Sequence, residues 1–132
     1  MLAWKTIEIG LTPNRADAIS QYGVAREVGV LTNKKLEDLS EPNILESGNN
    51  KINVEIQDLE GCPRYSGVVL ENIKVQESPI WIQNRLKSIG LNPINNVVDI
   101  TNYVMHAIGQ PLHAFDYDKI EELALKVKPK LI

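Results

Sequence analysis

The sequence predicts a mixed α/β fold of the α+β class. Two observations predict it. Segments that alternate apolar and polar residues, as strands do, lie at 5–9, 52–56 and, imperfectly, at 64–75. Segments with helical signals lie at 16–31, 78–89 and 95–108. We expect the fold to be incomplete and the chain to be a fragment of a longer polypeptide, because 120–132 forms a strand-like end with no visible partner.

Length, charge and cysteine content limit the possible functions. The 132 residues are enough for one ordinary domain, and 43% hydrophobic residues are enough for one core. A net charge of −3 is unusual for a free-standing nucleic-acid binder. Contact with RNA would therefore use a local basic face, drawn from Lys34, Lys35, Arg64, Lys74, Arg85 and Lys87.

A single cysteine and the absence of long apolar runs exclude further classes. Cys62 alone cannot form an internal disulfide or a multi-cysteine zinc site, and we expect it to be a small buried residue. The sequence shows no signal-peptide pattern and no apolar run near the ~18 residues that a membrane span needs. We therefore expect a cytoplasmic protein without membrane contact.

The first helix and the segment after it suggest a domain boundary. We expect the helix at about 16–31, capped by Thr12 or Asn14, with Pro13 near its first turn. The polar segment that follows, of roughly 20 residues, is too long for a plain loop within one compact unit. We therefore divide the chain into 1–32, a linker at 33–51, and 52–132.

The second helix has both a start and a stop signal. Ser78 is the expected cap and Pro79 the expected first helical residue, while Gly90 is typical of the position after a helix end. Four apolar residues approximate a core stripe, with the polar residues between them facing solvent. The stripe consists of Ile80, Trp81, Leu86 and Ile89.

The third helix precedes the most informative stretch. Its buried stripe is predicted at Val97, Ile100, Val104 and Ile108. A second face presents Asp99, Asn102 and Tyr103, which can form a hydrogen-bonded network that anchors the helix to adjacent loops. Gly109 ends the helix, and Pro111 prevents it from resuming.

His113 follows in an extended segment with apolar neighbours, and two interpretations are open. It is either a neutral histidine at the edge of a core, bonded to a carbonyl or to Asp116, or a pocket residue that positions a substrate carbonyl or a water molecule. A metal site built from Asp99, His106 and His113 offers few ligands, and the two histidines straddle a helix stop.

Several blocks resemble the beta subunit of bacterial phenylalanyl-tRNA synthetases, in the order and spacing of that family. They cover nearly the whole chain, and the last two are the most specific. The blocks are LTPNRADAISQYGVAREV (11–28), CPRYSG (62–67), SPIWIQNRL (78–86), GLNPINNVVDITNYV (90–104) and GQPLHAFD (109–116).

The resemblance implies a fold and a site. Residues 1–32 would end the N-terminal B1-like domain, and 52–132 would be the N-terminal half of the B3/B4 tRNA-binding and editing domain, which hydrolyses tyrosine mis-attached to phenylalanine tRNA. His113 would be the editing histidine and Pro111 part of the pocket wall. Asn92 stands where the family usually has arginine, so its contact with the tRNA end would be weaker.

The resemblance also implies what this chain lacks. The family's Gly-Gly-Glu loop would lie beyond Ile132, and the ATP and Mg²⁺ sites would lie in the alpha subunit or later in the beta subunit. The chain itself would hold no cofactor or metal and would be inactive alone. Its partners would be phenylalanine tRNA and the alpha subunit of an α2β2 heterotetramer, with homo-oligomers possible in isolation. The alternative is a non-catalytic tRNA-binding or scaffolding module.

Overall fold

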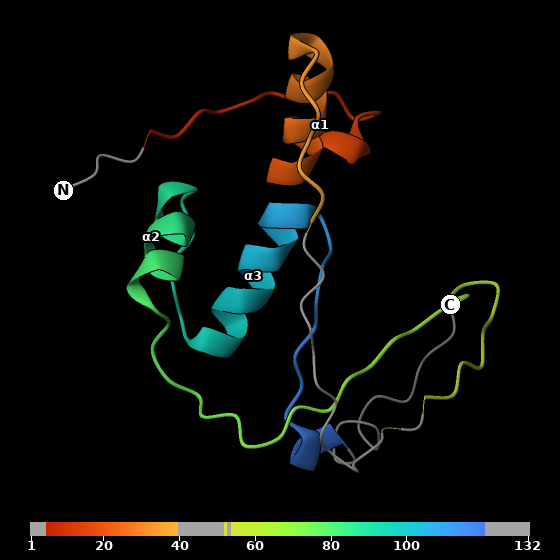
Figure 1. Cartoon of the computed structure of the whole chain (residues 1–132). Coiled ribbons are helices and arrows are strands. Elements are labelled where there is room, and N and C mark those ends of the chain that lie inside the picture. Colours follow the sequence, from red (N-terminus) through yellow and green to blue (C-terminus); the bar gives the residue numbers. More distant parts are fainter. Residues whose placement is uncertain (1–4, 40–51, 53, 121–132) are drawn as a thin grey trace. The chain divides into compact units, whose positions relative to one another are not determined.

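The computed structural model describes residues 5–39, 52 and 54–120 (Figure 1). Its elements are the 3₁₀ helix η1 (Ala16–Ala18), α1 (Gln21–Thr32), α2 (Ile80–Ser88), α3 (Asn96–Ile108) and the 3₁₀ helix η2 (Tyr117–Lys119). The described residues fall into two compact units. The first comprises 5–39 and 75–115 and holds the three α-helices; the second comprises 52, 54–74 and 116–120.

The described residues contain helices and no strand, so the mixed α/β prediction is not confirmed. Residues 5–9, 54–56 and 64–75 have irregular backbone, and the strands predicted there are wrong. Alternation of apolar and polar residues indicates a segment that can cover a core with one face. A strand also needs a neighbouring strand that bonds its backbone N–H and C=O groups. The predicted run at 121–132 and most of the linker, 40–51, lie outside the described residues.

Helix α1 begins later than the sequence predicts. The Thr12 hydroxyl donates to Asn14 Oδ1 at 2.6 Å, so these two side chains bond each other and do not cap the helix. A short 3₁₀ turn comes first, and Ser20 is extended and caps α1 by accepting from Gly23 N at 2.9 Å. Capping by Thr12 or Asn14 is therefore a wrong prediction; Ser20 lies inside the predicted helix.

Helix α2 ends where the sequence predicts, but the face that it buries differs from the predicted one. Gly90 adopts φ +83°, and Leu91 N donates to the Leu86 carbonyl at 3.0 Å, which confirms the predicted stop. The buried residues of α2 are Ile82, Gln83 and Leu86. Ile80, Trp81 and Ile89 are exposed, so the predicted stripe is wrong except at Leu86.

Helix α3 is confirmed at both ends. The Asn95 side chain accepts from the backbone N–H groups of Val97 and Val98 at 3.0 Å, and Gly109 closes the helix at φ +81°. The predicted stripe is only half covered, because Ile100 and Ile108 are exposed. The one buried residue of this helix is Asp99.

The buried carboxylate of Asp99 joins the starts of α2 and α3. It is 0% exposed. Its Oδ2 accepts from the Ser78 hydroxyl at 2.5 Å and its Oδ1 from Ile94 N at 2.8 Å. The prediction that Ser78 caps α2 is therefore wrong: its hydroxyl bonds Asp99 in the first turn of α3. Pro79 occupies the N-cap position of α2. The Gln83 amide donates to the Ser78 carbonyl at 2.7 Å and completes the network.

The second unit is organised by a turn. The Asp58 carboxylate accepts from Glu60 N and Gly61 N at 3.1 and 2.9 Å, as turn-forming aspartates do. A Cβ at Gly67 would lie 3.4 Å from the Ile52 side chain, so two predicted strand segments approach each other here without pairing. Cys62 is half-buried, less than predicted.

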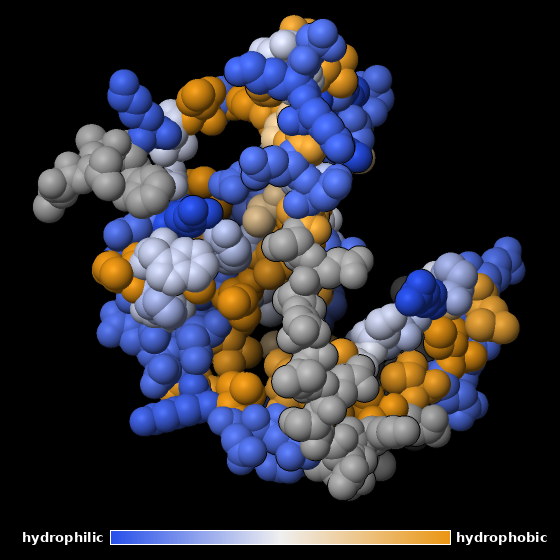
Figure 2. Space-filling model, viewed as in Figure 1, coloured by the Kyte–Doolittle hydropathy of each residue, from blue (hydrophilic) through white to orange (hydrophobic). Residues whose placement is uncertain are grey.

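Few apolar residues are buried. The fully covered apolar side chains in the described part of the chain are Ala18, Ile82 and Leu86. Many large aliphatic residues reach the surface, and apolar side chains are visible among polar ones on the face shown in Figure 2. Exposed apolar surface on this scale is typical of a face that contacts something else. No helix in the described ranges is long and apolar enough to cross a membrane.

Candidate functional site

The candidate site begins where α3 ends. Gly109 N donates to the Met105 carbonyl at 2.9 Å, and the left-handed backbone of Gly109 turns the chain out of the helix. The start of α1 lies against this turn, since a Cβ at Gly109 would lie 3.5 Å from the Ser20 side chain. The N-terminal end of α1 therefore meets the C-terminal end of α3.

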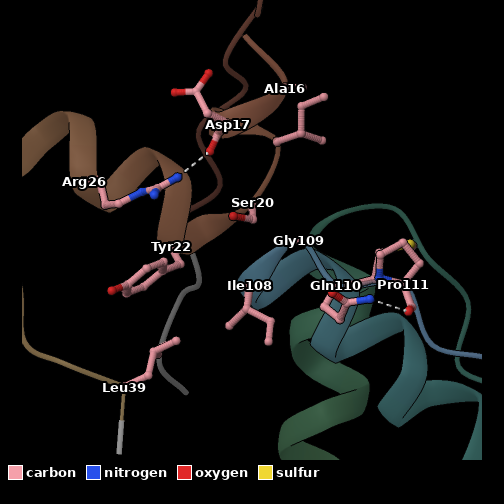
Figure 3. Close-up of a pocket in the computed structure, with 12 residues that line it drawn as sticks. Ala16, Asp17, Ser20, Tyr22, Arg26, Leu39, Ile108, Gly109, Gln110 and Pro111 are labelled. Carbon is pink, nitrogen blue, oxygen red and sulfur yellow. Dashed lines mark hydrogen bonds between the residues drawn. The ribbon is translucent and has the colours of Figure 1, made fainter. Parts of the chain in front are cut away.

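An open pocket of about 720 Å³ lies at this meeting point (Figure 3). One side consists of residues around the start of α1, including Asp17, Tyr22 and Arg26. The other side consists of the last turn of α3 and the two residues that follow Gly109. Pro111 lies in this second wall, where the Gln110 amide donates to its carbonyl at 3.1 Å.

Arg26 supplies the cationic side of the pocket. Its Nη2 donates to the Asp17 carbonyl at 3.0 Å, and its guanidinium carbon lies 5.7 Å from the centroid of the Tyr22 ring. These contacts fix the guanidinium between a backbone acceptor and an aromatic face. The pocket therefore presents a held cation and a phenol, groups that donate hydrogen bonds to polar or anionic ligands.

The Asp17 side chain belongs to an exposed ion-pair cluster. Arg15 contacts Asp17 at 3.0 Å and Glu27 at 2.7 Å. Hydrogen bonding and attraction from Arg15 hold the pKa of the Asp17 carboxyl below its usual value, while the two carboxylates raise the pKa of Arg15. The cluster ties the turn before α1 to the body of the helix.

We expect an NMR carboxyl titration to place the pKa of Asp17 below its usual value, and Arg15→Gln to move it back up. Because the folded-state pKa is the lowered one, the ion pair stabilises the fold above the ordinary carboxyl pKa. That contribution is lost as pH falls through the lowered value. Arg85→Gln, which leaves the Asp17 contacts in place, is the control. An unchanged Asp17 pKa in Arg15→Gln would contradict the assignment.

The predicted site residues are only partly brought together. His113 is exposed and lies outside the pocket wall; its ring stacks at a tilt on Phe115 with centroids 6.3 Å apart. The placement at a core edge is therefore wrong. Asp116 pairs with Lys119 at 3.1 Å. Asn92 is exposed in the turn between α2 and α3.

The predicted network of Asp99, Asn102 and Tyr103 divides into separate contacts. Asp99 bonds Ser78 and Ile94, as described above, and Asn102 is half-buried. Tyr103 accepts from Arg85 Nη1 at 3.1 Å and meets the Trp81 ring edge-on at 5.4 Å. Ser78 directly precedes the N-cap of α2, Trp81 and Arg85 lie on α2, and Ile94 directly precedes the N-cap of α3, so the two groups hold α3 from different points.

The remaining polar candidates are divided between the two units. His106 is exposed in the last turn of α3. Lys34, Lys35, Arg85 and Lys87 belong to the first unit, and Arg64 and Lys74 to the second. Across 5–39, 52 and 54–120, no three histidine, cysteine or acidic side chains come close enough to hold a metal ion.

Sequence reasoning missed the α1 side of the pocket. Tyr22 and Arg26 are one turn apart, so their spacing alone indicates a shared helix face. What the sequence does not show is the contact of that face with Gly109, since nothing local links Ser20 to a residue so far along the chain.

Residues 61–130 match the model of the B3/4 domain. The chain belongs to the B3/4 domain family. Its B3/4 region contains α2, α3 and the segment from Gly109 that carries Pro111 and His113.

The chain is also similar to phenylalanine–tRNA ligase beta subunits, which confirms the resemblance drawn from the sequence blocks. It is 48% identical to that of Bacteroides fragilis over 94% of its length and 16% of the relative's. The identity is 51% for Carboxydothermus hydrogenoformans, over 86% of this chain and 14% of the relative. For Porphyromonas gingivalis it is 52%, over 83% and 14%. This B3/4 chain thus spans about a sixth of the relatives' length.

Proposed function

We propose that this chain is a region of a phenylalanine–tRNA ligase beta subunit and carries part of a site that hydrolyses tyrosine mis-attached to phenylalanine tRNA. The observation that carries the proposal is similarity to such subunits along 94% of the chain, together with the B3/4 match over the Gly109–Asp116 segment. Histidine and proline at 113 and 111 are the residue types that the editing hypothesis requires.

The parent complex would attach phenylalanine to its tRNA in the cytoplasm, as an α2β2 heterotetramer of alpha and beta subunits. ATP and Mg²⁺ would be used outside this chain, by the alpha subunit or by later parts of the beta subunit. The beta-subunit relatives carry the ligase in their names, which supports the partner alpha subunit. By itself the chain is proposed to be inactive.

The chemistry of the two amino acids explains why such an enzyme needs a second site. Tyrosine is phenylalanine with one added hydroxyl group, and an apolar pocket rejects an added hydroxyl only by about 10²-fold. A separate pocket that recognises the hydroxyl and cleaves the ester supplies the missing discrimination. An esterase site requires a group that orients the ester carbonyl, the terminal ribose or the attacking water.

His113 is the residue proposed for that role. Its imidazole is exposed two residues beyond the Pro111 wall and is open to a ligand. The ring lies at a tilt to that of Phe115, with centroids 6.3 Å apart, and this contact occupies neither nitrogen. Both nitrogens therefore stay available for hydrogen bonds to a substrate. Asn92 can supply a neutral contact but no charge to the tRNA end.

In the full-length beta subunit assembled with its alpha subunit, His113→Ala is expected to slow hydrolysis of Tyr-tRNA by roughly 100-fold or more. Attachment of phenylalanine and affinity for the tRNA should remain unchanged, because neither depends on this side chain. Deacylation of purified Tyr-tRNA measures the first quantity, and filter binding measures the last.

His106→Ala is the matched control, since it removes the other histidine from an exposed position on α3. Its hydrolysis rate should equal that of the parent. Hydrolysis by the 132-residue chain alone should not exceed the buffer rate. Clear hydrolysis by that chain, or full activity of His113→Ala, would contradict the proposal.

One observation favours the alternative, a non-catalytic tRNA-binding or scaffolding module. Among the described residues, the pocket wall includes Pro111 but not His113. In a scaffold, His113→Ala would weaken tRNA binding and leave hydrolysis of Tyr-tRNA intact. The same two measurements therefore separate the two functions.

A further inference from the structure

A second concave surface lies on another side of α1. This groove, of about 960 Å³, runs between residues 5–11, α1 and residues 34–36, and reaches the ends of α2 and α3. The Thr6 hydroxyl donates to the Ser88 carbonyl at 2.9 Å, which fastens the N-terminal stretch to α2. The groove belongs entirely to the first unit.

The groove has an aliphatic floor. Ile7 is 81% exposed and Ile19 is 65% exposed, and Val28 adds a further exposed side chain from α1. The lining contains no Phe, Tyr or Trp, and its one aromatic ring is the imidazole of His106. Single-stranded nucleic acids bind to surfaces that offer aromatic rings for base stacking. An aliphatic floor instead matches the apolar side chains of a polypeptide.

The charges at the groove have one sign. Lys5, Lys34, Lys35 and Arg85 line it, with His106 at one end, and no lining residue is acidic. The chain as a whole has more acidic than basic residues, so the basic lining of the groove differs from the composition of the whole chain. Glu8, Glu37 and Asp38 flank lining residues in the sequence, but they do not line the groove themselves.

We propose that this groove binds a protein segment whose aliphatic side chains are flanked by carboxylates. The aliphatic floor would cover the apolar side chains of that segment, and the lysines would pair with its acidic ones. Opposite charges at the rim favour a partner of this composition over a basic one. The proposal is independent of the editing reaction, since it uses neither His113 nor Pro111.

A labelled helical peptide of roughly 15 residues, with leucine on one face and glutamate beside it, provides the probe. Fluorescence anisotropy with the full chain should show saturable binding. The same peptide with lysine in place of every glutamate should bind at least about tenfold more weakly, as should a single-stranded oligouridylate. Equal binding of the lysine peptide, or tighter binding of the oligouridylate, would overturn the proposal.

Two pairs of variants test the location. Lys34→Glu/Lys35→Glu should weaken binding of the glutamate peptide about tenfold, whereas Lys87→Glu/Lys119→Glu, with the same charge change outside the groove, should not. Val28→Ser should weaken it and Val30→Ser, on the same helix but outside the groove, should not. Circular dichroism verifies the fold of each variant. Equal effects within either pair, or a concentration-dependent dimer that Val28→Ser abolishes, would refute the assignment.

Discussion

Asp99→Ala is expected to lower the free energy of unfolding by about 3 kcal/mol. The substitution removes the acceptor of the Ser78 hydroxyl and of Ile94 N, both from a position that is 0% exposed. Ser78 is itself only 5% exposed, so water cannot replace the lost partner without opening the contact between α2 and α3. Urea unfolding followed by circular dichroism measures the change.

Two further variants separate this network from a general effect of truncation. The double variant Ser78→Ala/Asp99→Ala should lower the free energy of unfolding by less than the sum of the two single changes, because the donor and its acceptor are removed together. Asp118→Ala, in the exposed 3₁₀ helix η2, should change stability by less than about 0.5 kcal/mol. A strictly additive double variant would show that Asp99 and Ser78 act separately.

The Asp99 network also relates the fold to the candidate site. It fixes the start of α3, and the other end of the same helix delivers Gly109, Pro111 and His113. Because a helix is rigid, fixing its first turn also fixes the position of its last turn. Loss of Asp99 should therefore disturb the Pro111 wall even though the two residues are not in contact.

Features set by local residues were predictable from the sequence. Gly109 ends α3 because a left-handed stop needs only its immediate neighbours, whereas the cap at Asn95 was not predicted. Gly90 ends α2 for the same reason. Pro111 lies in the wall of the pocket at the end of α3. Its place in an editing pocket stays a prediction.

Features set by distant contacts were not predictable. The face that α2 buries depends on its packing against α3. Gln83 is buried on this face, and its amide donates to the Ser78 carbonyl. The start of α1 depends on how closely Gly23 approaches the turn before it. Alternation suggested strands, but a strand requires a partner, which periodicity does not identify. The α1 side of the pocket was missed for the same reason.

Gly23→Ala is expected to destabilise the chain by about 2 kcal/mol or more, although the same change in an open helix stabilises by about 1 kcal/mol. A Cβ at Gly23 would lie 2.3 Å from the Asp17 carbonyl oxygen and 2.9 Å from Ala18 Cα. Both are backbone atoms, and the Asp17 carbonyl is also bonded by Arg26, so neither can move aside without breaking the turn. Chemical denaturation measures the loss.

Gly10→Ala is the matched control, because a Cβ there meets nothing within 4 Å. Its stability should equal or slightly exceed that of the parent chain. In Gly23→Ala the displaced turn should also alter the pocket, since Asp17, Ser20 and Tyr22 all line it. A Gly23→Ala chain as stable as the parent would mean that helix propensity outweighs this backbone approach and that the start of α1 can shift.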